Sequence, residues 1–183
     1  MEFNAIGMLE FTSISAGINA ADQMLKTSKV ILLEAHPICP GKYMVLIAGG
    51  VDEVASSIEV GKRTGDSFMV DEIIIPNIHP GIFPALTASS AVSDIKALGV
   101  FETFSAASAI SSADKAVKAA NVELIDLRLA NGMGGKSYFT LTGEVYDVEA
   151  AMKAAEEELK DKGLIVNSVV IPSTHKELSK ALL

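Results

Sequence analysis

The chain has 183 residues, a formal net charge of −8 and a sequence pI near 4.9. An acidic chain lacks the positive surface that binds phosphates, so we expect no nucleic-acid partner. Although 49% of the residues are hydrophobic and the mean hydropathy is +0.36, no apolar run approaches the roughly 18 to 20 residues that span a bilayer. We therefore expect no membrane partner, and we attribute the apolar excess to contacts between subunits.

The chain contains one cysteine, which excludes an internal disulfide and fits a reducing compartment. Its first residues, MEFN, carry no basic or apolar leader and run directly into an apolar segment. We therefore expect a cytoplasmic protein.

The sequence repeats itself. Residues 5–10 (AIGMLE) return as residues 97–102 (ALGVFE), at an offset of 92. Residues 75–79 (IPNIH) return as residues 171–175 (IPSTH), at an offset of 96. The offset changes only in loops, as expected of a duplicated domain whose core elements keep their length.

The repeat predicts two domains, residues 1–90 and 91–183, joined by the small polar linker 87–91 (TASSA). Each half, at about ninety residues, has room for only a small core, so we expect the halves to support each other. Pro80 and Pro84 break a short tail turn that we expect at the end of the first domain.

Short apolar and β-branched runs in the first half predict four strands, at residues 5–11, 29–35, 42–48 and 72–76. A helix is predicted after Ser13, with its core-facing side formed by Ile14, Ile18, Ala21 and Leu25. A second helix is predicted from residue 51 to residue 63.

The second half repeats this order, with strands at 100–103, 122–127, 137–142 and 165–171 and helices at 106–119 and 148–160. Each half therefore reads β-α-β-β-α-β, the split arrangement of a ferredoxin-like α+β fold with its helices on one face of the sheet. Because a fold does not determine a function, the candidate sites are sought in the loops.

Cys39 follows the second predicted strand, in a loop that Pro37, Pro40 and Gly41 make stiff and exposed. A lone cysteine is most often a small buried hydrophobe, but these neighbours favour an accessible thiol. The second copy reads RLANGMGGK over residues 128–136 and has no thiol there. One thiolate is a poor metal site, since zinc and iron–sulfur centres need three or four ligands.

Symmetry can supply the missing ligands. Three chains of two domains each would imitate a hexamer and bring three Cys39 thiols to one axis. Three crowded thiolates repel one another unless a cation or cluster lies between them. A cubane cluster with three cysteine ligands and one open iron corner would satisfy that geometry.

The histidines favour structural roles. His36 could bind or tune a cluster, but a hydrogen bond within its loop is the simpler interpretation. His79 and His175 recur at equivalent places, although only one copy carries the thiol. The sequence contains no Ser/His/Asp arrangement, paired catalytic carboxylates, His-x-x-x-His or Cys-x-x-Cys, so we expect no enzyme activity.

Two further features have simple structural interpretations. The pairs Asp22/Lys26 and Asp114/Lys118 are spaced i, i+4 on helices and are expected to be solvated ion pairs. The glycine-rich segment 132–135 joins two strands and precedes no helix, so it does not fit a phosphate-binding loop.

The pattern A-[IL]-G-[MV]-[LF]-E, followed by A-D-x-x-[LV]-K, G-K before a strand and I-P-x-x-H, resembles the bacterial microcompartment (BMC) shell domain. It occurs twice and covers almost the whole chain, as in tandem-domain shell proteins that form trimers shaped like hexagonal tiles. The loop 38–42 (ICPGK) is similar to that of the propanediol-utilisation T type.

This resemblance implies a homotrimer that forms a pseudohexamer and assembles with other BMC shell proteins. It implies that Cys39 lies on the threefold axis, once per subunit, as a ligand of one 4Fe-4S cluster per trimer. It also implies that Ile38, Pro40 and Gly41 line the central pore.

At the tile edges, the resemblance implies contacts by Lys26 and Lys118. Many single-domain relatives carry an arginine after the proline of I-P-x-x-H and use it in these contacts. This chain has Asn77 and Ser173 there, so its detailed edge contacts are expected to differ.

We therefore expect a structural shell subunit whose cluster passes electrons across the shell or is delivered to encapsulated redox enzymes. The alternative is a plain tile with a metabolite-conducting pore and a free Cys39. A third candidate, a cytosolic ferredoxin-like regulator, would need a nucleotide pocket, and the acidic charge and missing phosphate loop count against it.

Overall fold

The computed structural model describes residues 3–183, which form two compact units divided after Ile78. Each unit contains one four-stranded antiparallel sheet. No helix within residues 3–183 has the length and apolar character needed to cross a membrane.

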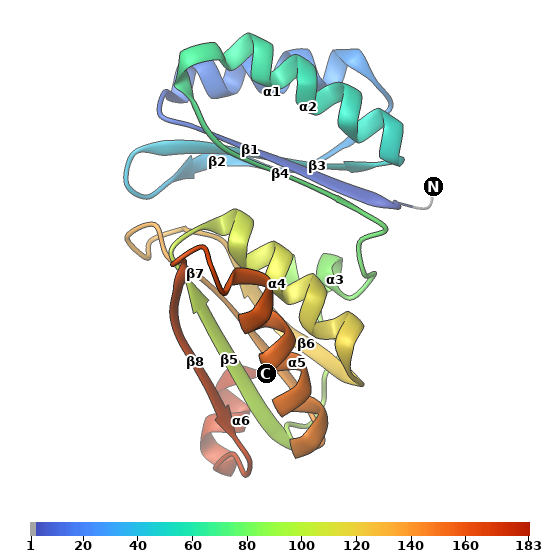
Figure 1. Ribbon diagram of the computed structural model, residues 1–183, viewed down its shortest axis with the longest axis vertical. Helices are drawn as coiled ribbons and strands as arrows, with labels where there is room; N and C mark the ends of the chain where they lie inside the picture. Colours follow the sequence, from blue (N-terminus) through green and yellow to red (C-terminus); the bar gives the residue numbers. More distant parts are fainter. Residues whose placement is uncertain (1–2) are drawn as a thin grey trace. The chain divides into compact units, whose positions relative to one another are not determined.

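The first unit has the predicted order of strands and helices. Its elements are β1 (Ala5–Phe11), α1 (Ile14–Thr27), β2 (Ile31–Ile38), β3 (Lys42–Gly49), α2 (Val51–Gly65), the 3-10 turn η1 (Asp66–Phe68) and β4 (Met69–Pro76). The strands lie in the order β2-β3-β1-β4, and both helices cover one face of the sheet (Figure 1).

The second unit repeats this plan and adds two short helices. Its elements are α3 (Ile82–Leu86), β5 (Ala97–Thr103), α4 (Ala106–Ala119), β6 (Val122–Arg128), β7 (Ser137–Gly143), α5 (Val145–Leu159), β8 (Ile165–Ile171) and α6 (Lys176–Leu182). The strand order β6-β7-β5-β8 matches that of the first unit (Figure 1). The predicted fold, two β-α-β-β-α-β domains in tandem, is confirmed.

Each sheet buries its helix-covered face in a core of large apolar side chains. In the first unit Leu9 and Phe11 of β1 pack with Met24 of α1 and Ile58 of α2. All seven residues of β1 are buried, and the strand lies between β3 and β4 in the sheet. In the second unit the rings of Phe101 and Phe139 stack with their centroids 5.3 Å apart.

Helix α1 turns a different face to the core than the sequence predicts. Gly17 and Met24 are buried, whereas Ile14 and Ile18 are exposed. A Cβ on Gly17 would lie 2.6 Å from the Tyr43 ring, so the helix uses its smallest residue to approach β3. Ile14, Ile18 and Leu25 are therefore left on the outer side of the helix, whereas Ala21, the fourth residue of the predicted face, is buried.

The units divide after Ile78 rather than at residue 90, where the sequence analysis placed the boundary. The segment that was expected to end the first domain packs instead with the second unit, where α3 lies against β6 and α4. Helix α6, which was not predicted, lies on the sheet of the second unit, where Leu182 packs against a cluster that includes Ile125.

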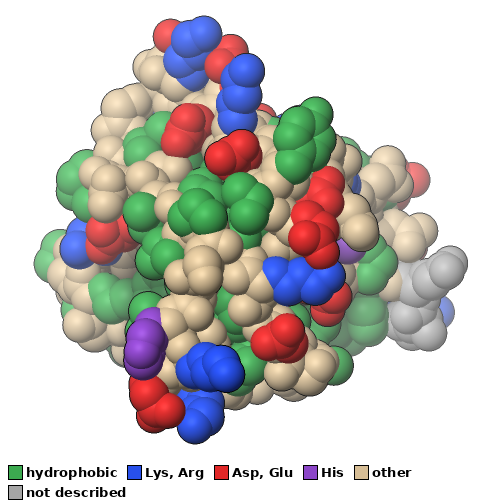
Figure 2. All heavy atoms as spheres, turned by 90° about the horizontal axis from the view of Figure 1, so that it is seen from below, with side chains coloured by type: hydrophobic (Ala, Val, Ile, Leu, Met, Phe, Trp, Pro, Cys, Tyr) green, Lys and Arg blue, Asp and Glu red, His purple; other side chains and the backbone are tan. Residues whose placement is uncertain are grey.

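Charged side chains of both signs are mixed on the surface. On the face shown in Figure 2, Lys and Arg side chains lie beside Asp and Glu side chains, around a central group of hydrophobic ones. Some of the charged side chains form ion pairs, such as Lys180–Glu177 and Lys96–Glu144.

Candidate functional site

The loop that carries Cys39 is a tight connection between β2 and β3. Ile38 pairs with Lys42 across it, so only Cys39, Pro40 and Gly41 lie outside the strands. Gly41 has a φ of +76°, a conformation that side chains other than glycine rarely adopt. The loop is therefore short and closely defined by its strand pair.

The loop presents its residues unequally to solvent. Pro40 and Gly41 are exposed and Cys39 is partly exposed, whereas Ile38 is buried in the first unit. Of the predicted pore-lining residues, Pro40 and Gly41 thus lie at the exposed tip of the loop, and Ile38 is buried. An accessible thiol at the tip can meet a metal or reactant from outside the unit, whereas buried structural cysteines are inert.

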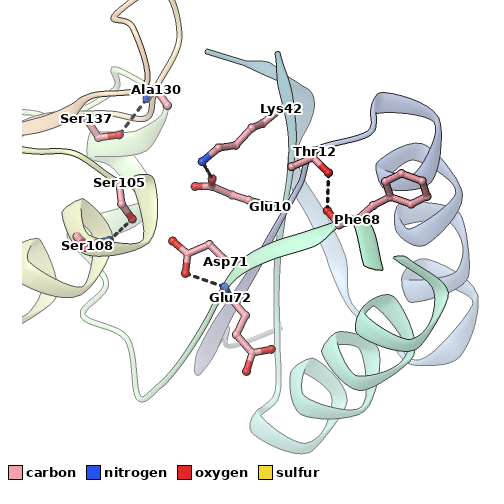
Figure 3. Close-up of polar contacts among 10 residues, drawn as sticks. All are labelled: Glu10, Thr12, Lys42, Phe68, Asp71, Glu72, Ser105, Ser108, Ala130 and Ser137. Carbon is pink, nitrogen blue, oxygen red and sulfur yellow. Dashed lines mark hydrogen bonds and ion pairs between the residues drawn. The ribbon is translucent and has the colours of Figure 1, made fainter. Parts of the chain in front are cut away.

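An ion pair holds the base of this loop. Nζ of Lys42, the first residue of β3, lies 2.8 Å from Oε2 of Glu10 on β1, and the Glu10 side chain is only 2% exposed (Figure 3). The second unit repeats the pair, with Nζ of Lys136 at 2.5 Å from Oε1 of Glu102. Both β2–β3-type loops are therefore tied to the central strand of their sheet.

His36 makes short-range hydrogen bonds, as the sequence analysis expected, but from within β2 rather than from the loop. Its Nε2 lies 2.7 Å from Oε2 of Glu34 and its Nδ1 lies 3.1 Å from the carbonyl oxygen of Pro37. Burial lowers the pKa of His36, but the hydrogen bonds to Glu34 and Pro37 and the charge of Glu34 outweigh it and raise the pKa above its ordinary value. Both ring nitrogens are thus occupied by protein groups.

The corresponding loop of the second unit has a different backbone. Ala130, Gly132, Gly134 and Gly135 all have positive φ values. The N–H of Ala130 donates to Oγ of Ser137 at 3.0 Å, which ties the loop to the start of β7 (Figure 3). This loop is longer, richer in glycine and carries no thiol, so the two copies present different chemistry at equivalent places.

Within residues 3–183, no group of three or more His, Cys, Asp or Glu side chains is arranged to hold a metal ion. One chain therefore provides Cys39 alone as a thiolate ligand, as the sequence predicts. A metal or cluster at this loop requires thiols from other copies.

The two lysines predicted at tile edges have different surroundings. Nζ of Lys26 lies 2.5 Å from Oδ2 of Asp22, and both side chains are well exposed. Nζ of Lys118 lies 2.6 Å from Oδ2 of Asp114, but the Asp114 side chain is only 4% exposed. The first pair is solvated as predicted, and the prediction for the second is wrong because the N–H of His79 also donates to Asp114, at 2.8 Å.

Sequence reasoning missed this contact because its donor is a backbone N–H, which no residue type identifies. The recurrence of I-P-x-x-H together with A-D-x-x-[LV]-K was the available signal.

The BMC domain family matches this chain twice, over residues 5–78 and 97–174. The chain therefore belongs to the BMC domain family. It is 42% identical over 174 residues to the bacterial microcompartment shell protein PduT of Citrobacter freundii, covering 95% of each chain.

Two other relatives agree with this assignment. A solved structure of a microcompartment protein from Desulfitobacterium hafniense superposes with a TM-score of 0.93 at 46% identity, covering 98% of this chain and 99% of that one. The carboxysome assembly protein CcmO of Synechocystis is 24% identical over 193 residues, which cover 98% of this chain and 64% of CcmO. The chain is thus a tandem-domain microcompartment shell protein similar to PduT.

Proposed function

We propose that three copies of this shell subunit form a ring of six BMC domains, with the Cys39 loops around its central passage and one 4Fe-4S cluster held by the three thiolates. The observation that carries the proposal is the partly exposed Cys39 at the tip of a loop whose base is fixed by Glu10 and Lys42. A rigid loop can hold the Cys39 thiol at the same position in each copy of the chain.

The donor set fits such a cluster only in a trimer. Iron–sulfur clusters are held by cysteine thiolates, and one chain contributes one. His36 has both ring nitrogens in contact with Glu34 and Pro37, so it is not offered as a further ligand. Three thiolates on one axis repel each other, which favours a bound cationic centre over an empty site.

When bound, such a cluster would supply one-electron transfer or a transferable iron–sulfur unit. The protein's own contribution is to hold three thiols at one axis through the short β2–β3 loop, with Pro40 and Gly41 at the exposed tip. Encapsulated redox enzymes are the partners that this chemistry suggests, and other shell proteins would meet the tile at Lys26 and Lys118.

The visible absorption and iron content of anaerobically purified protein test this proposal. We expect a brown protein with one cluster per three chains, where native mass spectrometry gives the number of chains. Trimers that never contain iron, even after treatment with ferrous iron and sulfide, would favour the plain tile with a metabolite-conducting pore. A stable monomer at micromolar concentration would contradict the ring itself.

A further inference from the structure

One contact ties the segment that follows β4 to the second unit. The N–H of His79 donates to Oδ1 of Asp114 on α4 at 2.8 Å, while Nζ of Lys118 lies 2.6 Å from Oδ2. Both carboxylate oxygens are thus occupied, and the side chain is 4% exposed. Hydrogen bonds to an ionised carboxylate are among the stronger ones in proteins.

The repeat places an equivalent carboxylate on α1, where only one of its two oxygens has a partner. Asp22 and Lys26 correspond to Asp114 and Lys118 at the offset of 92. Oδ2 of Asp22 is paired with Lys26 at 2.5 Å, as in the second unit. Within the described part of the chain, Oδ1 of Asp22 accepts no hydrogen bond, and the side chain is 50% exposed.

The repeat also places the same donor after β8. His175 corresponds to His79, and both histidines form the same local turn. Nδ1 of His79 accepts the N–H of Gly81 at 3.2 Å, and Nδ1 of His175 accepts the N–H of Glu177 at 3.3 Å. Among residues 3–183 the N–H of His175 has no acceptor, and His175 is exposed.

Apolar surface beside the carboxylates differs in the same way. Val117 of α4 lines a cavity together with His79 and Pro84 and is 7% exposed. Its counterpart on α1, Leu25, is 37% exposed. The surface that the His79 segment covers on α4 is therefore open on α1.

We infer that the N–H of His175 in one chain donates to Oδ1 of Asp22 in the next chain. This inference depends on the trimer of the proposed function. In a ring of three chains, first and second domains alternate. Each second domain is then followed around the ring by the first domain of the next chain, just as each first domain is followed by the second domain of its own chain. The His79–Asp114 contact would then recur in trans as His175–Asp22, and Leu25 would be covered with it.

The contact involves the turn at His175 and leaves α6 in place. Leu182 of α6 packs against the cluster of Ile95, Leu98 and Ile125 in its own unit. The donor lies just before α6 begins at Lys176, so the turn is available without unfolding the helix.

Cross-linking of introduced cysteines in a Cys39→Ser background tests the inference. We expect a short bis-maleimide to join Asp22→Cys/His175→Cys chains to one another, giving bands of two and three chains on a denaturing gel. The matched control, His79→Cys/Asp114→Cys, should cross-link only within a chain. If native mass spectrometry shows trimers but the first pair gives only single chains while the control reacts, the inference is wrong and the trimer stands.

Substitution of the acceptor provides a second measurement. Asp22→Ala should raise the dissociation constant of the trimer roughly tenfold or more. Asp22→Asn keeps an oxygen at Oδ1 and should raise this constant less. Asp114→Ala should instead destabilise the second unit independently of chain concentration. Unchanged association in Asp22→Ala would overturn the assigned contact, whereas monomeric parent protein would overturn the proposed function itself.

Discussion

Glu10 and Lys42 form an ion pair in which only the lysine reaches solvent. The lysine Nζ lies 2.8 Å from a carboxylate side chain that is 2% exposed, directly below the loop that carries Cys39. An ionised group in such a position is stable only while its partner remains. The pair therefore connects the stability of the first unit to the geometry of its loop.

Replacing Lys42 with Met should destabilise the protein by about 2–3 kcal/mol, because it leaves the Glu10 carboxylate buried and unpaired. The matched variant in the second unit, Lys136→Met, should cost about 1 kcal/mol or less, because Glu102 is 31% exposed. Urea unfolding at fixed chain concentration measures both. Equal losses of unfolding free energy in the two variants would show that burial of the carboxylate does not determine the effect of the substitution.

Gly17→Ala should also destabilise the first unit, by about 1–3 kcal/mol. Alanine favours helix formation, but its Cβ would lie 2.6 to 2.9 Å from ring and Cβ atoms of Tyr43, which cannot move away easily. The second unit has Ala109 and Ser137 at these positions. In a double-mutant cycle, Gly17→Ala should therefore cost less in a Tyr43→Ser background than in the wild type, and equal costs in both backgrounds would contradict the packing explanation.

Cys39→Ser should remove the iron and brown colour completely rather than partially, because one substitution removes all three thiolates of the trimer. The trimer should remain, since the loop lies outside the strands and helices. Met133→Ser, in the corresponding loop of the second unit, removes a sulfur but no thiolate and serves as the control. Iron retained in Cys39→Ser protein would exclude Cys39 as the ligand.

Lys26→Ala should reduce incorporation into shells, which co-purification with other shell proteins measures, and should weaken the trimer only as far as Asp22, its ion-pair partner, contributes to the contact with the next chain. Lys118→Ala should in addition lower stability by about 1–2 kcal/mol, because Asp114 is buried and would keep only the His79 N–H. Normal incorporation of a Lys26→Ala/Lys118→Ala variant would remove both lysines from the tile edge.

The His36–Glu34 pair should make stability depend on pH. Because the folded-state pKa of His36 is raised above its unfolded value, the protonated pair stabilises the fold fully below the unfolded pKa. That contribution is lost as the pH rises through the folded pKa. The difference in unfolding temperature between the wild type and His36→Gln should therefore be larger at pH 6 than at pH 8, and a reversed order would contradict the assignment.

The sequence predicted strands and helices best where side-chain patterns are strong. The limits of β1, α4 and β8 agree with the structure, because long apolar or alanine-rich runs end there at polar or turn residues. The core-facing side of α1 was not predictable from periodicity alone, since the contact between Gly17 and Tyr43 depends on the spacing of a helix and a sheet. Helix α6 (KELSKAL) was missed because seven largely polar residues carry little helical signal.

Residue types also predicted part of the candidate site. The exposed loop and the local role of His36 were predictable, because proline, glycine and histidine have distinct chemistry at such positions. The His79–Asp114 contact was not, because a backbone donor is the same in every residue other than proline.

The presence of the thiol in only one of two homologous loops has a consequence for symmetry. A six-sided tile made of identical single domains can place a given side chain at its axis six times or not at all. A tile made of three double domains can place it three times, and the glycine-rich loop of residues 132–135 can fill the alternate positions without a thiol. Duplication followed by divergence of one loop thus makes threefold chemistry accessible inside a sixfold outline.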